Sequence, residues 1–465
     1  MFEKATYVKR RSTLVEKMDS GIMVFMGNES VGMNYKDNTY HFRQDSNFLY
    51  FFGIDQENLI AIIDIDENKA TIYGDELSVE YVVWMGPQVT IKEKASKVGV
   101  SQTASYAQAA KQIAEAKSKG RAVHFLPQYR ASNMIKLSSW LDYNVEKIKV
   151  TYSEKFVKSI VGLRSIKSDE EVAEMEKALE TTKEMHLVAM KHAREGIKES
   201  FLTGLVEWQA TAGGGGLAYP IILTINGQTL HNHYHGNDLK KGQLILGDFG
   251  ADTAMHYASD ITRTFPVDSK FTPQQKDIYE IVLKAEMDCI EALKPEILYR
   301  DLHMKAAKIT LEGLKELGLV KGNIDDALVQ GAYGLFFPHG LGHMIGLDVH
   351  DMEDLGEQYV GYRPGLERSK QFGLKSLRLA KELEQGNVLT VEPGIYFIPE
   401  LIQKWAKEKI CNDFINYDKI TDYLAFGGIR IEDNCLITQK GQRILGPTIA
   451  KQINEIEEIR QGGLS

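Results

Sequence analysis

Four carboxylates and one histidine, set in apolar surroundings in the second half of the chain, constrain its fold more than any other feature. Asp248 and Asp260 lie in GDFGADTAMHYASDITRTFPV, and His343 lies in PHGLGHMIGLDVHD. Glu392 follows VLTV, and Glu432 lies in GGIRIEDN. Four acids share one pocket at neutral pH only if positive charge holds them together. The sequence therefore predicts either a pair of metal ions or a buried network of arginine and carboxylates.

The length of 465 residues exceeds one typical core, so two domains are expected, over residues 1–160 and 161–465. The apolar runs 21–27 and 58–66 are typical of buried strands in a mixed or parallel sheet. The run 104–120 has the pattern of an amphipathic helix that ends at Gly120. This alternation predicts an α/β layered domain at the N-terminus.

A long helix is expected to open the second domain. Ser168 and Glu171 have the capping-box spacing, so a helix should start just after Ser168, and Gly196 is expected to end it. Two further helices are predicted over 273–293 and 299–318. Helices of this kind would cover the sheet that carries the acids.

Strand-like runs carry all four acids. The run that leads to Asp248 and the run that follows Asp260 are expected to pair antiparallel through a short turn near 251–253. That pairing would put the two carboxylates roughly 5 Å apart on one face. Glu392 and Glu432 lie in two more strand-like runs, VLTVEPGIYFI and GGIRIEDNCLIT. The second domain is therefore predicted to be α+β.

The histidines favour a metal site over a network in which Arg430 neutralises the acids. His339 and His343 stand four residues apart in HGLGH, where the glycines predict a tight loop that presents the imidazoles. His350 follows in LDVHD. Oxygen-rich ligation with one imidazole suits manganese, cobalt, iron or zinc, with carboxylates that bridge two ions. The sequence lacks H-E-x-x-H, which excludes a zincin-type protease.

Composition excludes several classes of partner. The net charge of −9 argues against nucleic acid, because phosphate binding needs a concentrated basic surface. The three cysteines form no C-x-x-C pair, which indicates a reducing compartment rather than a disulfide framework. The N-terminal MFEKATYVKRRSTLVEK has no apolar core of a signal peptide, and no apolar run is long enough for a membrane span. A cytoplasmic protein without a membrane partner is expected.

On these motifs the chain resembles the pita-bread (creatinase/aminopeptidase-like) metallopeptidases: methionine aminopeptidase, aminopeptidase P and prolidase. Four stretches match the family's motifs in order: SDITRTFPV, HGLGHMIGLDVHD, TVEPGIYF and GIRIED. YHFRQDSNFLYFFG and VVWMGP resemble the N-terminal domain of aminopeptidase P and prolidase, which methionine aminopeptidases lack. The resemblance implies an α/β N-terminal domain followed by an α+β pita-bread catalytic domain.

The resemblance also implies which residues bind metal. Two divalent ions, with Mn²⁺ expected and Co²⁺, Fe²⁺ or Zn²⁺ as alternatives, would be held by Asp248, Asp260, His343, Glu392 and Glu432. Asp260 and Glu432 would bridge the two ions. The spacing between Asp248 and Asp260 is one residue longer than the family pattern, so a different turn is expected there.

Catalytic and substrate-binding roles follow from the same resemblance. His231 would be the substrate-binding histidine, with His233 as the alternative for that role. His350 would contact the scissile carbonyl, and His339 would line the pocket near the proline. Arg430 would steady a ligand carboxylate or meet the substrate. Glu392, His350 and His231 would form the catalytic set.

The implied function is a metal-dependent exopeptidase that hydrolyses the Xaa-Pro bond at the free N-terminus of proline-containing peptides. A hydroxide bridging the ions would attack the scissile carbonyl, and Glu392 would pass its proton to the leaving nitrogen. A prolidase restricted to dipeptides, which the insertion 399–428 favours, and a metal-free peptide-binding module are the alternatives. The resemblance further implies a homodimer or homotetramer, in which Trp84 either reaches a neighbour's active site or lies buried in the core.

Overall fold

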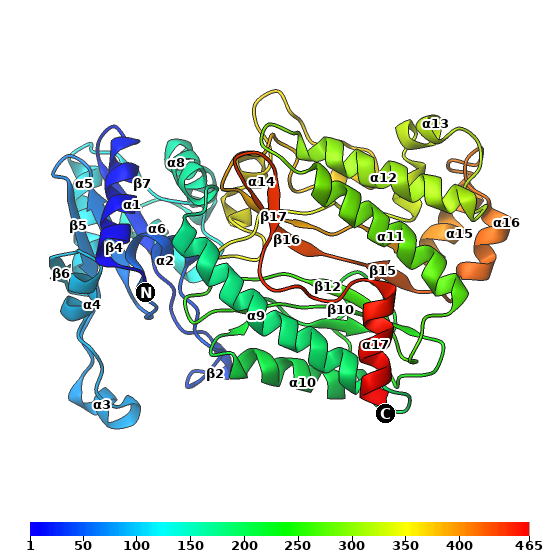
Figure 1. Cartoon of the computed structure of the whole chain (residues 1–465). Helices are drawn as coiled ribbons and strands as arrows, with labels where there is room; N and C mark the ends of the chain where they lie inside the picture. The colour runs from blue at the N-terminus through cyan, green and yellow to red at the C-terminus, as the bar shows by residue number, and fades with distance from the viewer. Residues whose placement is uncertain (465) are drawn as a thin grey trace. The chain divides into compact units, whose positions relative to one another are not determined.

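A computed structural model describes residues 1–464 and divides the chain into two compact units (Figure 1). The first unit holds Met1–Arg164 together with Met352–Tyr359, and the second holds Ser165–Asp351 and the chain from Val360 onward. Met352–Tyr359 thus packs with the first unit although it lies in the second half of the sequence. Within the described residues, no helix combines the length and the apolar character that a membrane span requires.

The first unit is built on a five-stranded sheet in the order β6-β5-β4-β1-β7. Its strands are β1 (Ile22–Met26), β4 (Ile60–Asp64), β5 (Lys69–Tyr73), β6 (Gln102–Ala104) and β7 (Val123–His124). β1 pairs antiparallel with β4 and parallel with β7, so the sheet is mixed, as predicted. The expected helix is α5 (Tyr106–Ser118), and Gly120 follows it with a φ of +71°, a conformation that favours glycine.

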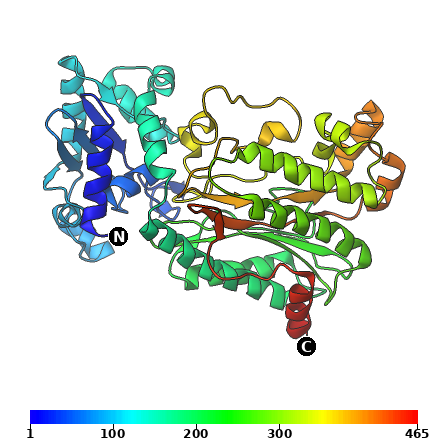
Figure 2. The ribbon, with the colours of Figure 1, turned by 45° about the horizontal axis from the view of Figure 1, so that its top comes forward.

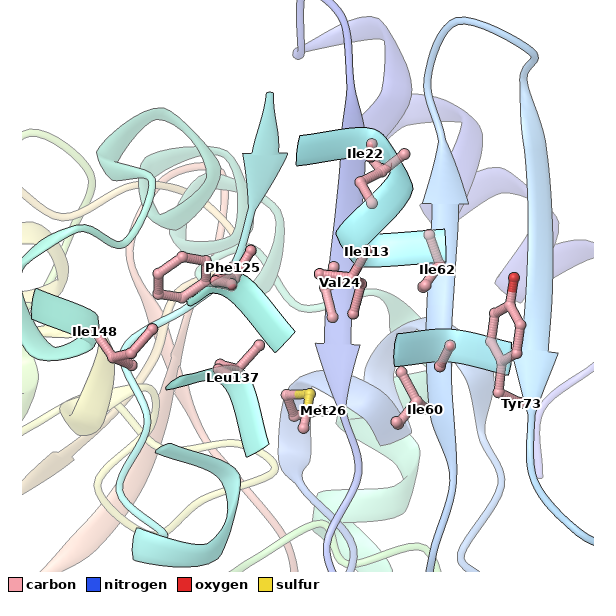
Figure 3. Packing of buried hydrophobic residues seen from close by; sticks show 13 residues of the cluster. Ile22, Val24, Met26, Ile60, Ile62, Tyr73, Ile113, Phe125, Leu137 and Ile148 are labelled. Carbon is pink, nitrogen blue, oxygen red and sulfur yellow. The ribbon is translucent and has the colours of Figure 1, made fainter. Parts of the chain in front are cut away.

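Both faces of this sheet are buried, which explains why β1 and β4 show no alternation of polar and apolar residues. On one face Ile22, Val24 and Met26 of β1 pack with Ile60 and Ile62 of β4 and with side chains of the helices that follow (Figure 3). On the other face Phe25 meets an aromatic cluster; its partners are Phe51, Phe52 and Phe156. The other elements of the unit are α1 (Lys4–Glu16), β2 (Gly32–Tyr35), β3 (Asn38–Thr39), α2 (Ser46–Phe52), α3 (Val79–Met85), α4 (Ile91–Lys97), α6 (Ala131–Leu141), α7 (Val145–Val150) and α8 (Glu154–Arg164).

Two pairs of helices enclose the strands of the second unit, one pair on each side (Figures 1 and 2). The pairs are α9 (Asp169–His192) with α10 (Glu199–Ala212), and α11 (Pro273–Ala292) with α12 (Tyr299–Glu316). Ser168 and Glu171 form the predicted capping box of α9. The helix ends at His192 instead of near Gly196, because Ala193 already has an extended backbone. Gly196 lies in the connection to α10.

The strands of the second unit form short antiparallel groups. They are β8 (Gly216–Leu217), β9 (Ile222–Thr224), β10 (Leu244–Asp248), β11 (Ala251–Asp252), β12 (Thr262–Pro266), β13 (Val388–Val391), β14 (Gly394–Tyr396), β15 (Gly428–Arg430), β16 (Asp433–Ile437) and β17 (Gln442–Ile444). β10 pairs with β12 as predicted, but the expected short turn near 251–253 is wrong. That segment is β11, which pairs with β8 on one side and bridges Ala258 on the other, so the turn lies beyond it, at 253–256.

Short helices complete the second unit and the loops around it. They are α13 (Ile324–Val329), α15 (Pro399–Glu408), α16 (Tyr417–Ile420) and α17 (Ile453–Leu464), whereas α14 (Glu357–Val360) begins in the segment Met352–Tyr359 of the first unit. α17 packs against α9, and α11 packs against β13, β14 and β15. The strands that carry the acids are therefore held between helices that are distant in sequence.

Candidate metal centre

Register places the first two acids on one face of the β10–β12 pair. Asp248, the last residue of β10, lies opposite Thr262, and the Phe249 amide donates to the Ile261 carbonyl beyond it. Asp260 therefore stands diagonally across from Asp248, two residues before Thr262. Since side chains alternate along a strand, Asp260, Thr262 and Asp248 all point to the same side.

The other two acids lie where the second strand pair is interrupted. Glu392 and Pro393 separate β13 from β14, and Ile431 and Glu432 separate β15 from β16. Pro393 lacks a backbone donor for a ladder, and so favours the break at this point. The Glu432 amide donates to the Thr262 carbonyl at 3.1 Å. The two strand pairs are thus joined directly at the acids.

His343 lies in a loop that runs beside β13, and the loop itself fixes its ring. The His343 amide donates to Thr390 Oγ1 at 3.2 Å. Its Nδ1–H donates to the Met344 carbonyl at 3.0 Å, so Nε2 is turned toward the acids. Nε2 lies 3.3 Å from Asp260 Oδ2 and 3.9 Å from Glu392 Oε1. Without metal the Nε2–H donates to Asp260, and loss of that proton leaves the tautomer that a metal-ligating histidine needs.

Donor atoms of Asp260, His343 and Glu432 all lie within 4.8 Å of one another. Glu432 Oε2 accepts from the Thr262 hydroxyl at 2.7 Å, whereas Oε1 is buried without a hydrogen-bond partner among the described residues. A buried, unpartnered carboxylate oxygen is costly unless a cation meets it. The chemistry of this donor set therefore fits divalent metal ions.

Asp248 has two polar partners that bear on the alternative of an arginine network. Arg430 Nη2 forms a short ion pair with Asp248 Oδ2. The Tyr219 hydroxyl lies 2.7 Å from Asp248 Oδ1 and also contacts Asp260 Oδ1. Arg430 thus neutralises one acid, and the predicted network exists at Asp248. Within the described residues, the guanidinium of Arg430 donates to Thr262, Tyr396 and Asp248, and to neither Glu392 nor Glu432.

Electrostatics shows that the cluster lacks positive charge. Burial raises the pKa of Glu392 to about 7, and burial together with Asp260 and Glu392 raises the pKa of Glu432 well above its ordinary range. Burial also raises the pKa of Asp248. The pKa of Asp260 is lowered despite burial, because the His343 ring hydrogen-bonds to it. Without metal, the centre therefore holds protons that a divalent ion would displace.

All of the predicted site residues line one cavity of about 480 Å³, a volume typical of a small-ligand site. The structure brings together Asp248, Asp260, His343, Glu392, Glu432, His231, His233, His339, His350 and Arg430. The His343 and His350 rings lie 4.3 Å apart between centroids. Tyr396 accepts from Arg430 Nη1 and lies 2.8 Å from His339 Nε2, so it links the two side chains.

Sequence reasoning missed three polar side chains of this cavity: Tyr219, Ser376 and Arg378. Tyr219 follows the glycine run without any distinguishing pattern. Arg378 lies in a loop far from every acid in the sequence. Only the folded chain places them beside the carboxylates, and a motif search among histidines and acids gives no signal for them.

Comparison with known proteins identifies the family. Residues 173–439 match the model of metallopeptidase family M24, and residues 7–124 match the aminopeptidase P N-terminal domain. The chain belongs to metallopeptidase family M24. This confirms the predicted family and the predicted fold class, with an N-terminal domain of the aminopeptidase P type and a pita-bread catalytic domain.

Relatives of this metallopeptidase carry two different names. The chain is 32% identical to the rat Xaa-Pro dipeptidase over 95% of its own length and 89% of the relative. It is also 32% identical to a probable Xaa-Pro aminopeptidase of Sordaria macrospora, over 95% and 92% of the two chains. Among solved structures, zinc-substituted Escherichia coli aminopeptidase P in complex with product matches with a TM-score of 0.81 and 27% identity, over 99% of both chains.

Proposed function

We propose that this metallopeptidase is a Xaa-Pro aminopeptidase, which removes the first residue of peptides whose second residue is proline. The convergence of four carboxylates and His343 on one cavity supports the proposal most strongly. The relatives named for Xaa-Pro hydrolysis support the choice of peptide bond. Hydrolysis of a Xaa-Pro-Xaa tripeptide by the purified protein in Mn²⁺ tests it. Failure to cleave any Xaa-Pro bond with metal bound would refute it.

Two divalent ions would be held by the five predicted ligands, with Asp260 and Glu432 shared between them. When bound, the ions lower the pKa of water and polarise the scissile carbonyl. Mn²⁺ is proposed as the native ion, with Co²⁺, Fe²⁺ or Zn²⁺ as alternatives. Elemental analysis of protein purified without added metal, followed by reconstitution with each ion, decides among them. Protein that binds none of the four would support the metal-free binding module instead.

Proton transfer is assigned to Glu392. Its carboxylate lines the cavity with Oε1 3.9 Å from His343 Nε2, within reach of water held beside the other ligands. It would carry a proton from that water to the leaving nitrogen. Its Oε2 lies 3.8 Å from Nδ1 of His339, whose pKa burial lowers, so that ring stays neutral and does not compete for the proton.

The remaining histidines are proposed to bind the substrate. His350, beside His343, would donate to the oxyanion that develops on the scissile carbonyl. His339 is held between the Gly340 carbonyl and Tyr396, and would form the wall beside the proline ring. His231, whose pKa burial lowers, or its neighbour His233 would receive the peptide. A pocket without an acceptor for an amide N–H would suit proline, whose nitrogen carries none.

Prolidase activity is the second candidate, and Arg378 favours it. A dipeptidase must hold the substrate carboxylate near the reacting bond, for which a guanidinium is well suited. Arg378 lines the cavity and, by its charge, helps to lower the pKa of His231 after burial and Arg430. If dipeptides are the preferred substrate, Arg378→Ala should reduce their kcat/KM about tenfold or more and spare tripeptides.

The decisive comparison uses Ala-Pro and Ala-Pro-Ala with the wild type, Arg378→Ala and Arg363→Ala. Arg363 pairs with Glu382 on the exposed side of a neighbouring loop and serves as the matched control. We expect the tripeptide to be the better substrate for all three proteins. Hydrolysis of the dipeptide alone, abolished by Arg378→Ala only, would establish the prolidase instead.

A homodimer or homotetramer is also proposed. Trp84 is 82% exposed on α3, so the prediction of a buried core tryptophan is wrong. Val79, Val83 and Met85 on the same helix are exposed as well, and such a patch is typical of a surface that meets another chain. Light scattering of the wild type and Trp84→Ser tests the assembly. A cytoplasmic location remains a prediction from the sequence.

A further inference from the structure

Arg263 of β12 is buried, with 1% of its surface exposed, although it carries a full charge. It follows Thr262, so its side chain leaves the strand on the face opposite to Asp260 and Thr262. A buried guanidinium is stable only when its five N–H groups are satisfied. The hydrogen-bond acceptors of Arg263 therefore show which segments this buried charge holds together.

One side of the guanidinium binds the segment that contains Glu432. Nη1 donates to the Glu432 carbonyl at 2.6 Å and to the Thr262 carbonyl at 3.0 Å. Nη2 forms an ion pair with Asp433 Oδ1 at 2.6 Å. Because Ile431 and Glu432 interrupt the strand ladder, the Glu432 carbonyl has no strand partner there, and Arg263 supplies one.

The other side of the guanidinium binds the segment before α17. Nε donates to the Ala450 carbonyl at 3.0 Å, and Nη2 donates to the Ile449 carbonyl at 3.1 Å. Lys451 in the same segment forms an ion pair with Asp433 Oδ2 at 2.5 Å. Arg263 and Lys451 thus clamp Asp433 from two directions.

We infer that Arg263 is a positioning residue of the metal centre, which fixes the backbone of Glu432 through its carbonyl and through the neighbouring Asp433. This inference rests on the proposed function, because it takes Glu432 as a metal ligand. Apart from this, the one hydrogen bond that the described residues make to the Glu432 side chain comes from the Thr262 hydroxyl. Groups that orient a ligand in this way contribute to metal affinity without touching the metal.

Arg460 of α17 provides the matched control. It is also fully buried, and its guanidinium donates only to backbone carbonyls, those of Met190, Ala193, Pro266, Val267 and Asp268. None of these carbonyls belongs to a proposed ligand or to its neighbour. Substitution of Arg460 therefore disturbs the same unit through the same chemistry while the ligand backbones keep their contacts.

The experiment measures Mn²⁺ binding to metal-free protein by calorimetry, together with the Tm of each variant. Arg263→Gln and Arg460→Gln are compared, and Arg263→Lys and Arg460→Lys provide milder pairs in case a glutamine variant does not fold. We expect both positions to lower Tm. Only the Arg263 variants should weaken Mn²⁺ binding, by about 10- to 100-fold, the range typical of groups that orient ligands.

The outcomes distinguish failure of the proposed function from failure of the positioning role of Arg263. Wild-type protein that binds no metal would overturn the proposed function and this inference with it. Wild-type protein that binds Mn²⁺, with Arg263 variants of equal affinity or Arg460 variants weakened just as much, would overturn the positioning role alone. A loss of Mn²⁺ affinity in the Arg263 variants that Asp433→Asn partly reproduces would support the role of the Arg263–Asp433 ion pair in positioning Glu432.

Discussion

Replacement of Glu392 by glutamine should stabilise the metal-free protein at alkaline pH, although it removes a proposed ligand and proton carrier. Burial raises the pKa of this carboxyl from its ordinary 4.5 to about 7. Its side chain is 19% exposed, and its nearest basic neighbours are the imidazoles of His339, which burial keeps neutral, and His343. Ionisation of Glu392 is therefore disfavoured in the folded protein, and glutamine cannot ionise.

The sign and size of the effect follow from linkage. Between pH 4.5 and 7 the folded protein binds more protons at this site than the unfolded chain, so the stability of the metal-free protein falls as pH rises through that window. A shift from 4.5 to about 7 corresponds to about 3 kcal/mol, at about 1.4 kcal/mol per pH unit. The loss is absent at pH 4 and complete by pH 8.

Thermal unfolding in EDTA at pH 5 and pH 8 measures this difference. Glu392→Gln should lie within about 2 °C of the wild type at pH 5 and exceed its Tm at pH 8 by about 6 °C, at about 2 °C per kcal/mol for a unit of this size. Glu367→Gln, at an exposed position outside the cavity, is the control and should give the wild-type profile. A Glu392→Gln protein that is destabilised equally at both pH values would refute the reasoning.

Three further predictions concern the pair beside His350, the long helix and the metal. Lys167 Nζ lies 2.8 Å from Asp351 Oδ2, and both side chains are 1% exposed. Lys167→Met leaves the Asp351 charge buried without this partner, so it should lower the free energy of unfolding in urea by about 3–5 kcal/mol. The double variant Lys167→Met with Asp351→Leu should lower it less. Ser168→Ala removes the cap of α9 and should cost about 1 kcal/mol, with faster amide exchange confined to the first turn. Metal removal by EDTA should abolish hydrolysis until Mn²⁺ is restored, and Mn²⁺ affinity should fall at least about tenfold from pH 8 to pH 6, because Glu392 takes up a proton in that range.

Local signals predicted the elements well where the pattern is strong. The capping box fixed the start of α9, and the apolar runs gave β1, β4, β10 and β12. Strand boundaries at the acids were not predictable in the same way. VLTVEPGIYFI and GGIRIEDNCLIT have no turn signal beyond Pro393, so hydrophobic patterning could not show that each run breaks at its acid.

Contacts made by side chains from distant segments were beyond the sequence. Arg263 and Tyr219 carry no motif of their own, and their partners at Ala450 and Asp248 are far away along the chain. The exposed Trp84 was equally hidden, because a tryptophan in an apolar run is usually buried. Motifs predicted the acids and histidines of the centre, whereas the residues that hold them in position are visible only in the folded structure.

The distribution of charge around the cavity explains where negative charge is left uncompensated and cations are expected to bind. Arg430 compensates Asp248, while Arg263 and Lys451 compensate Asp433 behind the strands. In the described part of the chain, the remaining carboxylates, those of Asp260, Glu392 and Glu432, form no ion pair with lysine or arginine.

Among the residues that the structure describes, His343 alone lies within ion-pair distance of both Asp260 and Glu392. The deficit of positive charge is therefore concentrated where the donor atoms of Asp260, His343 and Glu432 converge. Protons can fill that deficit, as the raised pKa of Glu432 indicates, but each binds a single oxygen. Divalent ions bind several carboxylates at once, so the acids that arginine and lysine leave unpaired favour metal at this point of the cavity.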